Sequence, residues 1–138
     1  MIGCVASMWL LACGESKESS IEPLPELQGV AVAEDVNPAE DIVEVHLRAT
    51  EFEGTLGGDN SLRLFGYNGS APGPLLQARV GDEIVVHFTN DLSEPTTIHW
   101  HGLRIADDMD GTPRVQAPVQ PGETFVYRFD AVEAGSYW

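Results

Sequence analysis

The run Thr124-Phe125-Val126-Tyr127-Arg128-Phe129 places its three aromatic side chains at every second position. Successive side chains of a β-strand point to opposite faces, so the three aromatics share one face and Arg128 lies on the other. Residues 83–89 alternate in the same way, with isoleucine, valine and phenylalanine on one side. This pattern predicts strands whose apolar faces meet in a core between two packed sheets.

From residue 42 onward, the sequence consists of short alternating stretches separated by turn signals rich in glycine, proline, asparagine and aspartate. Neither a helical period of useful length nor an internal repeat is present. Short strands at close spacing predict an all-β domain, either a sandwich or a barrel. The strands that we expect cover residues 42–50, 62–67, 75–79, 83–89, 97–101, 124–129 and 136 onward.

The first 13 residues have the composition of an export signal. An apolar stretch over residues 8–12 is too short to span a bilayer and ends at Cys13, after which charged and polar residues follow. The run Leu10-Leu11-Ala12-Cys13 resembles the lipobox of bacterial lipoproteins. We therefore expect an exported protein of the cell envelope or cell surface, held at a membrane by a lipid on Cys13. An ordinary cleaved signal peptide is the alternative.

Acidic residues dominate the next segment of the chain. Residues 15–41 hold eight carboxylates and one lysine among serine, proline and alanine, which predicts a disordered acidic tether over residues 14–41. Residues 42–138 are then the folded domain. The formal net charge of the chain is −15 with only seven basic residues. Phosphate binding needs clustered lysine and arginine, so we expect no nucleic-acid partner.

The two cysteines, Cys4 and Cys13, both lie in the predicted signal. The folded part therefore has no internal disulfide and no thiolate ligand for a metal. A blue-copper centre, which needs a cysteine together with two histidines, cannot be built from this chain.

The run His99-Trp100-His101 places two imidazoles on one side of an expected strand, roughly 6.6 Å apart, with Trp100 pointing the other way. Imidazole binds copper, zinc, iron and nickel, so the pair alone does not identify a metal. Two solvated side chains on a polar face are the alternative. His46 and His87 each stand alone in an alternating strand, where a structural role is favoured over metal binding.

Several motifs follow one another in a fixed order: residues 67–74 (YNGSAPGP), 80–86 (VGDEIVV), 97–103 (TIHWHGL), 109–113 (MDGTP), 118–123 (PVQPGE) and 134–138 (AGSYW). This series resembles the N-terminal, plastocyanin-like cupredoxin domain of the laccase-like multicopper oxidases. The resemblance is close over residues 60–138 and loose over residues 42–60. It implies a cupredoxin-like Greek-key β-sandwich or barrel, incomplete at its C-terminus.

The resemblance also implies roles for individual residues. His99 would bind the type 2 copper and His101 one of the paired type 3 coppers of a trinuclear cluster. In the family, this cluster reduces O₂ to water with four electrons, which a type 1 copper receives from a reducing substrate. Asp110 matches an acidic residue that helps to deliver protons to the cluster. The alternative for Asp110 is an ordinary Asp-Gly turn.

The chain ends at Trp138, inside an expected strand, and the family's remaining copper ligands follow in a C-terminal cupredoxin domain. We therefore expect this sequence to be the N-terminal part of an oxidase, inactive alone, whose reducing substrate is a phenol or a metal ion. A non-catalytic copper-binding module for copper storage or delivery is the alternative. A copper nitrite reductase fits less well, because its first domain should carry a cysteine ligand.

Overall fold

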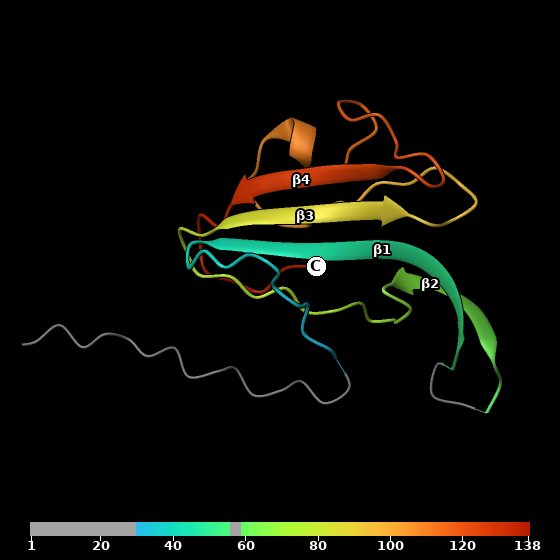
Figure 1. Ribbon diagram of the computed structural model, residues 1–138. Helices are drawn as coiled ribbons and strands as arrows, with labels where there is room; N and C mark the ends of the chain where they lie inside the picture. Colours follow the sequence, from blue (N-terminus) through green and yellow to red (C-terminus); the bar gives the residue numbers. More distant parts are fainter. Residues whose placement is uncertain (1–29, 56–58) are drawn as a thin grey trace, which may run out of the picture.

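The computed structural model describes residues 30–55 and 59–138. Four strands form one sheet in the order β2-β1-β3-β4 (Figure 1). The strands are β1 (Ile42–Gly54), β2 (Leu62–Tyr67), β3 (Glu83–Asn90) and β4 (Thr124–Asp130), and one short 3₁₀ turn, η1 (Asp107–Met109), lies beside β4. Each of these strands was expected from the alternation, which confirms the all-β class.

The predicted signal peptide with its lipobox, and the tether up to residue 29, lie outside the described residues. Within residues 30–55 and 59–138, no helix is both long enough and apolar enough to cross a membrane.

The sheet is mixed. β1 pairs with β3 in parallel, whereas β2 and β4 are antiparallel to their neighbours. A parallel pair needs a long crossover between its strands, and here the connection runs through β2 and the loop after it. His46 on β1 lies directly opposite His87 on β3, and Val86 lies opposite Tyr127 on β4.

The core lies on one face of this sheet. Its deepest side chains include Val45, Val86, Phe88 and Tyr127, none more than 1% exposed. The opposite side of the core is covered by segments outside the named strands, which contribute Ala33, Leu76, Ile98, Trp100, Leu103, Ile105, Met109 and Val119. The predicted packing of an apolar sheet face against a second layer is therefore present, but that second layer is made of extended segments and not of regular strands.

Three of the expected strands are not regular strands in the structure. Residues 75–79 make one isolated bridge, between Leu75 and Val32, and residues 97–101 and 136–138 belong to no strand. The physical reason is that alternation places side chains on two faces but does not supply a backbone partner. Residues 97–101 keep the alternating burial of a strand and bond mainly to side chains and single carbonyls.

The last part of the predicted acidic tether binds the domain. The backbone of residues 31–33 exchanges hydrogen bonds with Leu75, and these two segments run side by side (Figure 1). Val36 donates its backbone N–H to the Glu44 carbonyl at 2.8 Å, along the part of β1 that β2 does not reach. The described residues of the tether, from residue 30 to residue 41, are thus ordered against the sheet.

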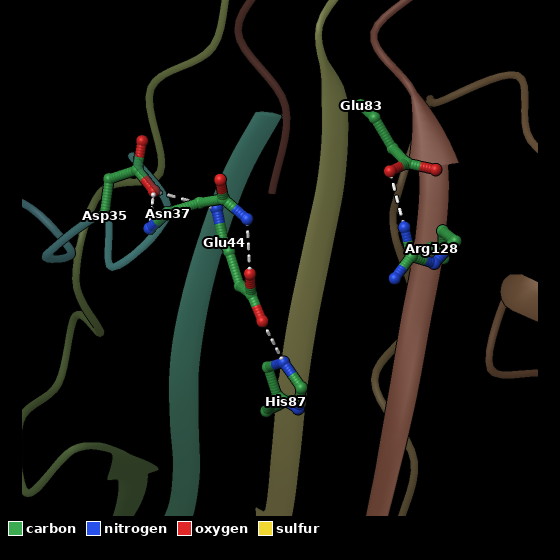
Figure 2. Close-up of polar contacts among 6 residues, drawn as sticks. All are labelled: Asp35, Asn37, Glu44, Glu83, His87 and Arg128. Carbon is green, nitrogen blue, oxygen red and sulfur yellow. Dashed lines mark hydrogen bonds and ion pairs between the residues drawn. The ribbon is translucent and has the colours of Figure 1, made fainter. Parts of the chain in front are cut away.

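The outer face of the sheet carries a polar network around Glu44 (Figure 2). The Glu44 carboxylate accepts a hydrogen bond from Asn37 Nδ2 at 2.6 Å and lies 2.6 Å from His87 Nε2. These contacts, the hydrogen bond from Asn37 first, hold the pKa of Glu44 below its usual value. The His46 and His87 rings stack at 4.8 Å. These contacts agree with the structural role expected for both histidines.

Candidate metal centre

His99 and His101 lie on the segment that covers the core. Ile98 and Trp100 point inward, where the Trp100 ring packs edge-on against Tyr127 and Phe129. His99 and His101 alternate with them and are exposed. The alternation thus places both histidines on one side of the segment, as predicted, although the segment is not a strand.

The two imidazoles are close enough to serve neighbouring metal ions. Their ring centroids lie 5.7 Å apart and the ring planes are nearly perpendicular. Within the described residues, no group of three or more histidine, cysteine, aspartate or glutamate side chains is placed to hold a metal. Among the described residues, the pair therefore offers two imidazoles with no third candidate ligand grouped beside them.

A hydrogen bond to Asp110 orients the His99 ring. His99 Nδ1 lies 3.1 Å from the Asp110 carbonyl oxygen and 3.2 Å from the carboxylate Oδ1 of the same residue. Because a carbonyl oxygen only accepts hydrogen bonds, Nδ1 carries the proton and donates it. The Nε2 lone pair of the neutral ring is then free to bind a metal, an arrangement that is common for metal-binding histidines.

A glycine brings the Asp110 loop against the histidine segment. Gly111 has a φ of 73°, and a Cβ at this position would overlap the Ile98 carbonyl oxygen. The close approach allows Thr97 Oγ1 to donate a hydrogen bond to the Gly111 carbonyl at 2.6 Å. Only glycine combines this left-handed backbone with the missing side chain that the contact needs.

His101 is held differently. Its backbone N–H donates to the Trp138 carbonyl at 2.8 Å, and its ring stacks on the Trp138 indole with centroids 4.7 Å apart. An indole face fixes the plane of the imidazole and uses neither ring nitrogen. Among the described residues, neither ring nitrogen of His101 has a hydrogen-bond partner.

The structure brings together the three predicted site residues, His99, His101 and Asp110. The sequence did not predict the residues whose hydrogen bonds support this site from the core side, which are Thr97, Gln116 and Tyr127. Tyr127 was expected only as a core aromatic, because alternation reveals that a side chain points inward but not what its hydroxyl bonds. Gln116 lies in a polar loop, where no sequence pattern indicates that its side chain is buried.

Comparison with known proteins identifies the class. The multicopper oxidase family model matches residues 49–138, most of the chain, and these residues include the histidine pair and the Asp110 loop. The chain belongs to the multicopper oxidase family, and the cupredoxin-like fold of its structural neighbours agrees with the observed sheet. Membership of this family implies copper binding by the protein.

The chain is similar to only part of each relative. It is 51% identical to the multicopper oxidase MmcO of Mycobacterium tuberculosis over 72 residues, which cover 52% of this chain and 14% of that protein. It is 46% identical over 79 residues to L-ascorbate oxidase of Nicotiana tabacum, covering 54% of this chain and 14% of that enzyme.

Solved structures give the same picture. A multicopper oxidase from Campylobacter jejuni, described as a metallo-oxidase, superposes with a TM-score of 0.71 at 32% identity and covers 79% of this chain. A multicopper oxidase from Pseudomonas thermotolerans superposes with a TM-score of 0.69 at 44% identity and covers 72% of this chain. The chain spans 23% and 25% of those two proteins.

Proposed function

We propose that the chain is the N-terminal cupredoxin part of a laccase-like oxidase, which couples one-electron oxidation of a reducing substrate to reduction of O₂. The observation that carries the proposal is the histidine pair, with the His99 Nδ1 proton donated to Asp110 and Nε2 left free. Family membership and similarity to oxidases that are several times longer support it. Further cupredoxin sequence would supply the remaining ligands and the type 1 copper.

In this proposal, His99 would hold the type 2 copper and His101 would hold one type 3 copper, each through a ring nitrogen. Bound copper would supply the redox chemistry by which O₂ takes up four electrons and four protons to give two waters. The protein keeps the ligands in place. The Asp110 carbonyl fixes the tautomer of His99, and the Trp138 indole fixes the plane of the His101 ring.

Asp110 has a second role in the proposal, as the proton relay to the cluster. Its carboxylate oxygen lies 3.2 Å from Nδ1 of His99, the residue that would hold the type 2 copper. Asp110 also closes the 3₁₀ turn by donating its backbone N–H to Asp107. A carboxylate in this place can pass protons, whereas its amide analogue cannot.

The reducing substrate is a phenol or a metal ion, and its binding surface belongs to the type 1 copper and not to this part of the protein. We further propose that the protein is exported and anchored in the cell envelope through a lipid on Cys13. The acidic segment would then space the anchor from the domain.

The test uses the natural gene product, expressed at full length and loaded with copper. His99→Ala and His101→Ala should each lower O₂ uptake at least about a hundredfold and reduce the copper content, because each removes a direct ligand. His46→Ala is the matched control, since it removes an exposed imidazole from the outer face of the sheet. It should leave both measurements unchanged.

Unaltered O₂ uptake in the two ligand variants would contradict the proposal. A wild-type protein that binds copper through His99 and His101 but consumes no O₂ with any phenol or metal ion would favour the alternative of copper storage or delivery.

The relay is tested by Asp110→Asn in the same full-length protein. The variant keeps the backbone carbonyl that orients His99, so the copper content should hold while O₂ turnover falls, most strongly toward high pH, where protons are scarce. Turnover equal to the wild type across the whole pH range would exclude the relay.

A further inference from the structure

A buried tyrosine connects the sheet to the histidine segment. Tyr127 on β4 is fully buried, and its hydroxyl oxygen accepts the backbone N–H of Ile98 at 2.8 Å. Ile98 immediately precedes His99 in the chain. The bond therefore reaches from a regular strand to the backbone that carries the proposed type 2 copper ligand.

This bond matters because the histidine segment is not part of a β-sheet, so no continuous row of backbone hydrogen bonds fixes its position over the core. The nearest backbone pairs are those of Thr96 with Val119 on one side and of His101 with Trp138 on the other. Between them, the Ile98 N–H has the Tyr127 hydroxyl as its partner among the described residues. A buried amide without a partner is destabilising, so this bond helps to hold the segment at its distance from β4.

The same hydroxyl also holds the loop that follows Asp110. Gln116 is buried, at 5% exposure, and its Nε2 donates a hydrogen bond to the Tyr127 oxygen at 3.0 Å. The phenol is thus a common anchor for two stretches of chain, one leading to His99 and one following Asp110. Their relative position determines whether the hydrogen bond between His99 and Asp110 can form.

We infer that Tyr127 is a positioning residue for the copper site: its buried hydroxyl sets the place of His99 relative to Asp110 through Ile98 and Gln116. This inference rests on the proposed function, because it assigns the residue a role toward the copper that His99 would hold. Tyr127 itself touches neither histidine ring, and its effect is transmitted through the backbone.

Tyr67 provides a matched control within the same core. Both tyrosines pack against Phe88, with centroid distances of 6.4 Å for Tyr67 and 6.2 Å for Tyr127. The Tyr67 hydroxyl makes no hydrogen bond to any described residue, and burial raises the pKa of its phenol. Replacing either tyrosine with phenylalanine removes one hydroxyl from the same cluster, but only Tyr127→Phe removes the bond to Ile98.

The experiment compares Tyr127→Phe with Tyr67→Phe in the full-length, copper-loaded protein. The readouts are the type 2 copper signal in electron paramagnetic resonance, the affinity for type 2 copper against a chelator, and thermal unfolding. Tyr127→Phe should weaken type 2 copper binding by about tenfold and alter its signal, as expected when a supporting contact behind a ligand is lost. Tyr67→Phe should match the wild type in both copper measurements.

A Tyr127→Phe protein with the type 2 signal and copper affinity of Tyr67→Phe would overturn the inference. If Tyr127→Phe does not fold, Gln116→Met takes its place, because it frees the phenol from its second partner. It should change the type 2 signal in the same direction, and an unchanged signal would again overturn the role. A wild-type protein without type 2 copper would instead refute the proposed function, and with it this assignment.

Discussion

The sheet and the segment that covers it are held together by different forces. β3 pairs along its length with β1 on one side and β4 on the other, and these strands bury apolar side chains in one core. Residues 96–103 bury Ile98 and Trp100 on the same core but depend on single bonds, several of them to side chains. Stability therefore resides mainly in the sheet, whereas the placement of His99 and His101 depends on a few side chains that contact their segment.

The largest expected effect comes from breaking the shared core. Phe88 is fully buried on β3, and Phe88→Ala should lower the free energy of unfolding by about 3–5 kcal/mol. The sheet and the covering segment should unfold together, because both pack against the core cluster that contains Phe88. Urea denaturation followed by circular dichroism measures the loss. Val126→Ala, at an exposed position on β4, should stay within about 0.5 kcal/mol of the wild type.

A smaller and more local effect is expected at Gly111. Gly111→Ala adds the cost of a left-handed alanine, about 1–2 kcal/mol, and a clash with the Ile98 carbonyl that moves the Asp110 loop. Gly69→Ala is the control, because Gly69 has a φ of 74° and a Cβ added there would meet open space. The unfolding free energy and the NMR shifts of the His99 ring should change more in Gly111→Ala than in Gly69→Ala.

Equal unfolding free energies and equal His99 shifts in the two alanine variants would contradict the close approach of the loop to the histidine segment. The placement of the histidine segment would then not depend on its contact with the Asp110 loop.

The smallest effect concerns the outer face of the sheet. The hydrogen bonds from Asn37 and His87 hold the pKa of Glu44 below its usual value, so the folded state favours the ionised carboxylate. This contribution to stability is complete above the unfolded pKa and disappears as the pH falls through the lower folded value. Glu44→Gln should therefore be less stable than the wild type near neutral pH, and the difference should shrink in acid.

Urea denaturation at several pH values measures this difference for Glu44→Gln. Glu94→Gln removes an exposed loop carboxylate and should show no such trend. A Glu44→Gln deficit that is the same at every pH would show that the lowered pKa does not stabilise the fold.

The sequence predicts most of the sheet, because alternation alone marks which faces of residues 42–50, 83–89 and 124–129 turn inward. It also predicts His99, His101 and Asp110, because their types and spacing match a known motif. Periodicity does not reveal backbone partners, which is why residues 97–101 were expected to form a strand. The acidic composition of residues 15–41 likewise gave no sign that Asp35 and Val36 form hydrogen bonds with the backbone of Glu44.

The supporting contacts of the site were beyond prediction for a related reason. The bond from Ile98 to Tyr127 joins residues 29 positions apart, and the bond from Thr97 to Gly111 depends on a glycine that the sequence marks only as a turn. Such contacts are products of the packed fold, since they require two segments to be placed side by side first.

Anomalous diffraction at the copper edge shows directly whether His99 and His101 bind copper. Crystals of the full-length, copper-loaded protein should give anomalous peaks about 2.0–2.1 Å from a ring nitrogen of each histidine, a distance typical of metal–imidazole bonds. At His99, this nitrogen should be Nε2, because Nδ1 donates to Asp110. Copper bound elsewhere in the protein, with both of these rings free of metal, would contradict the account.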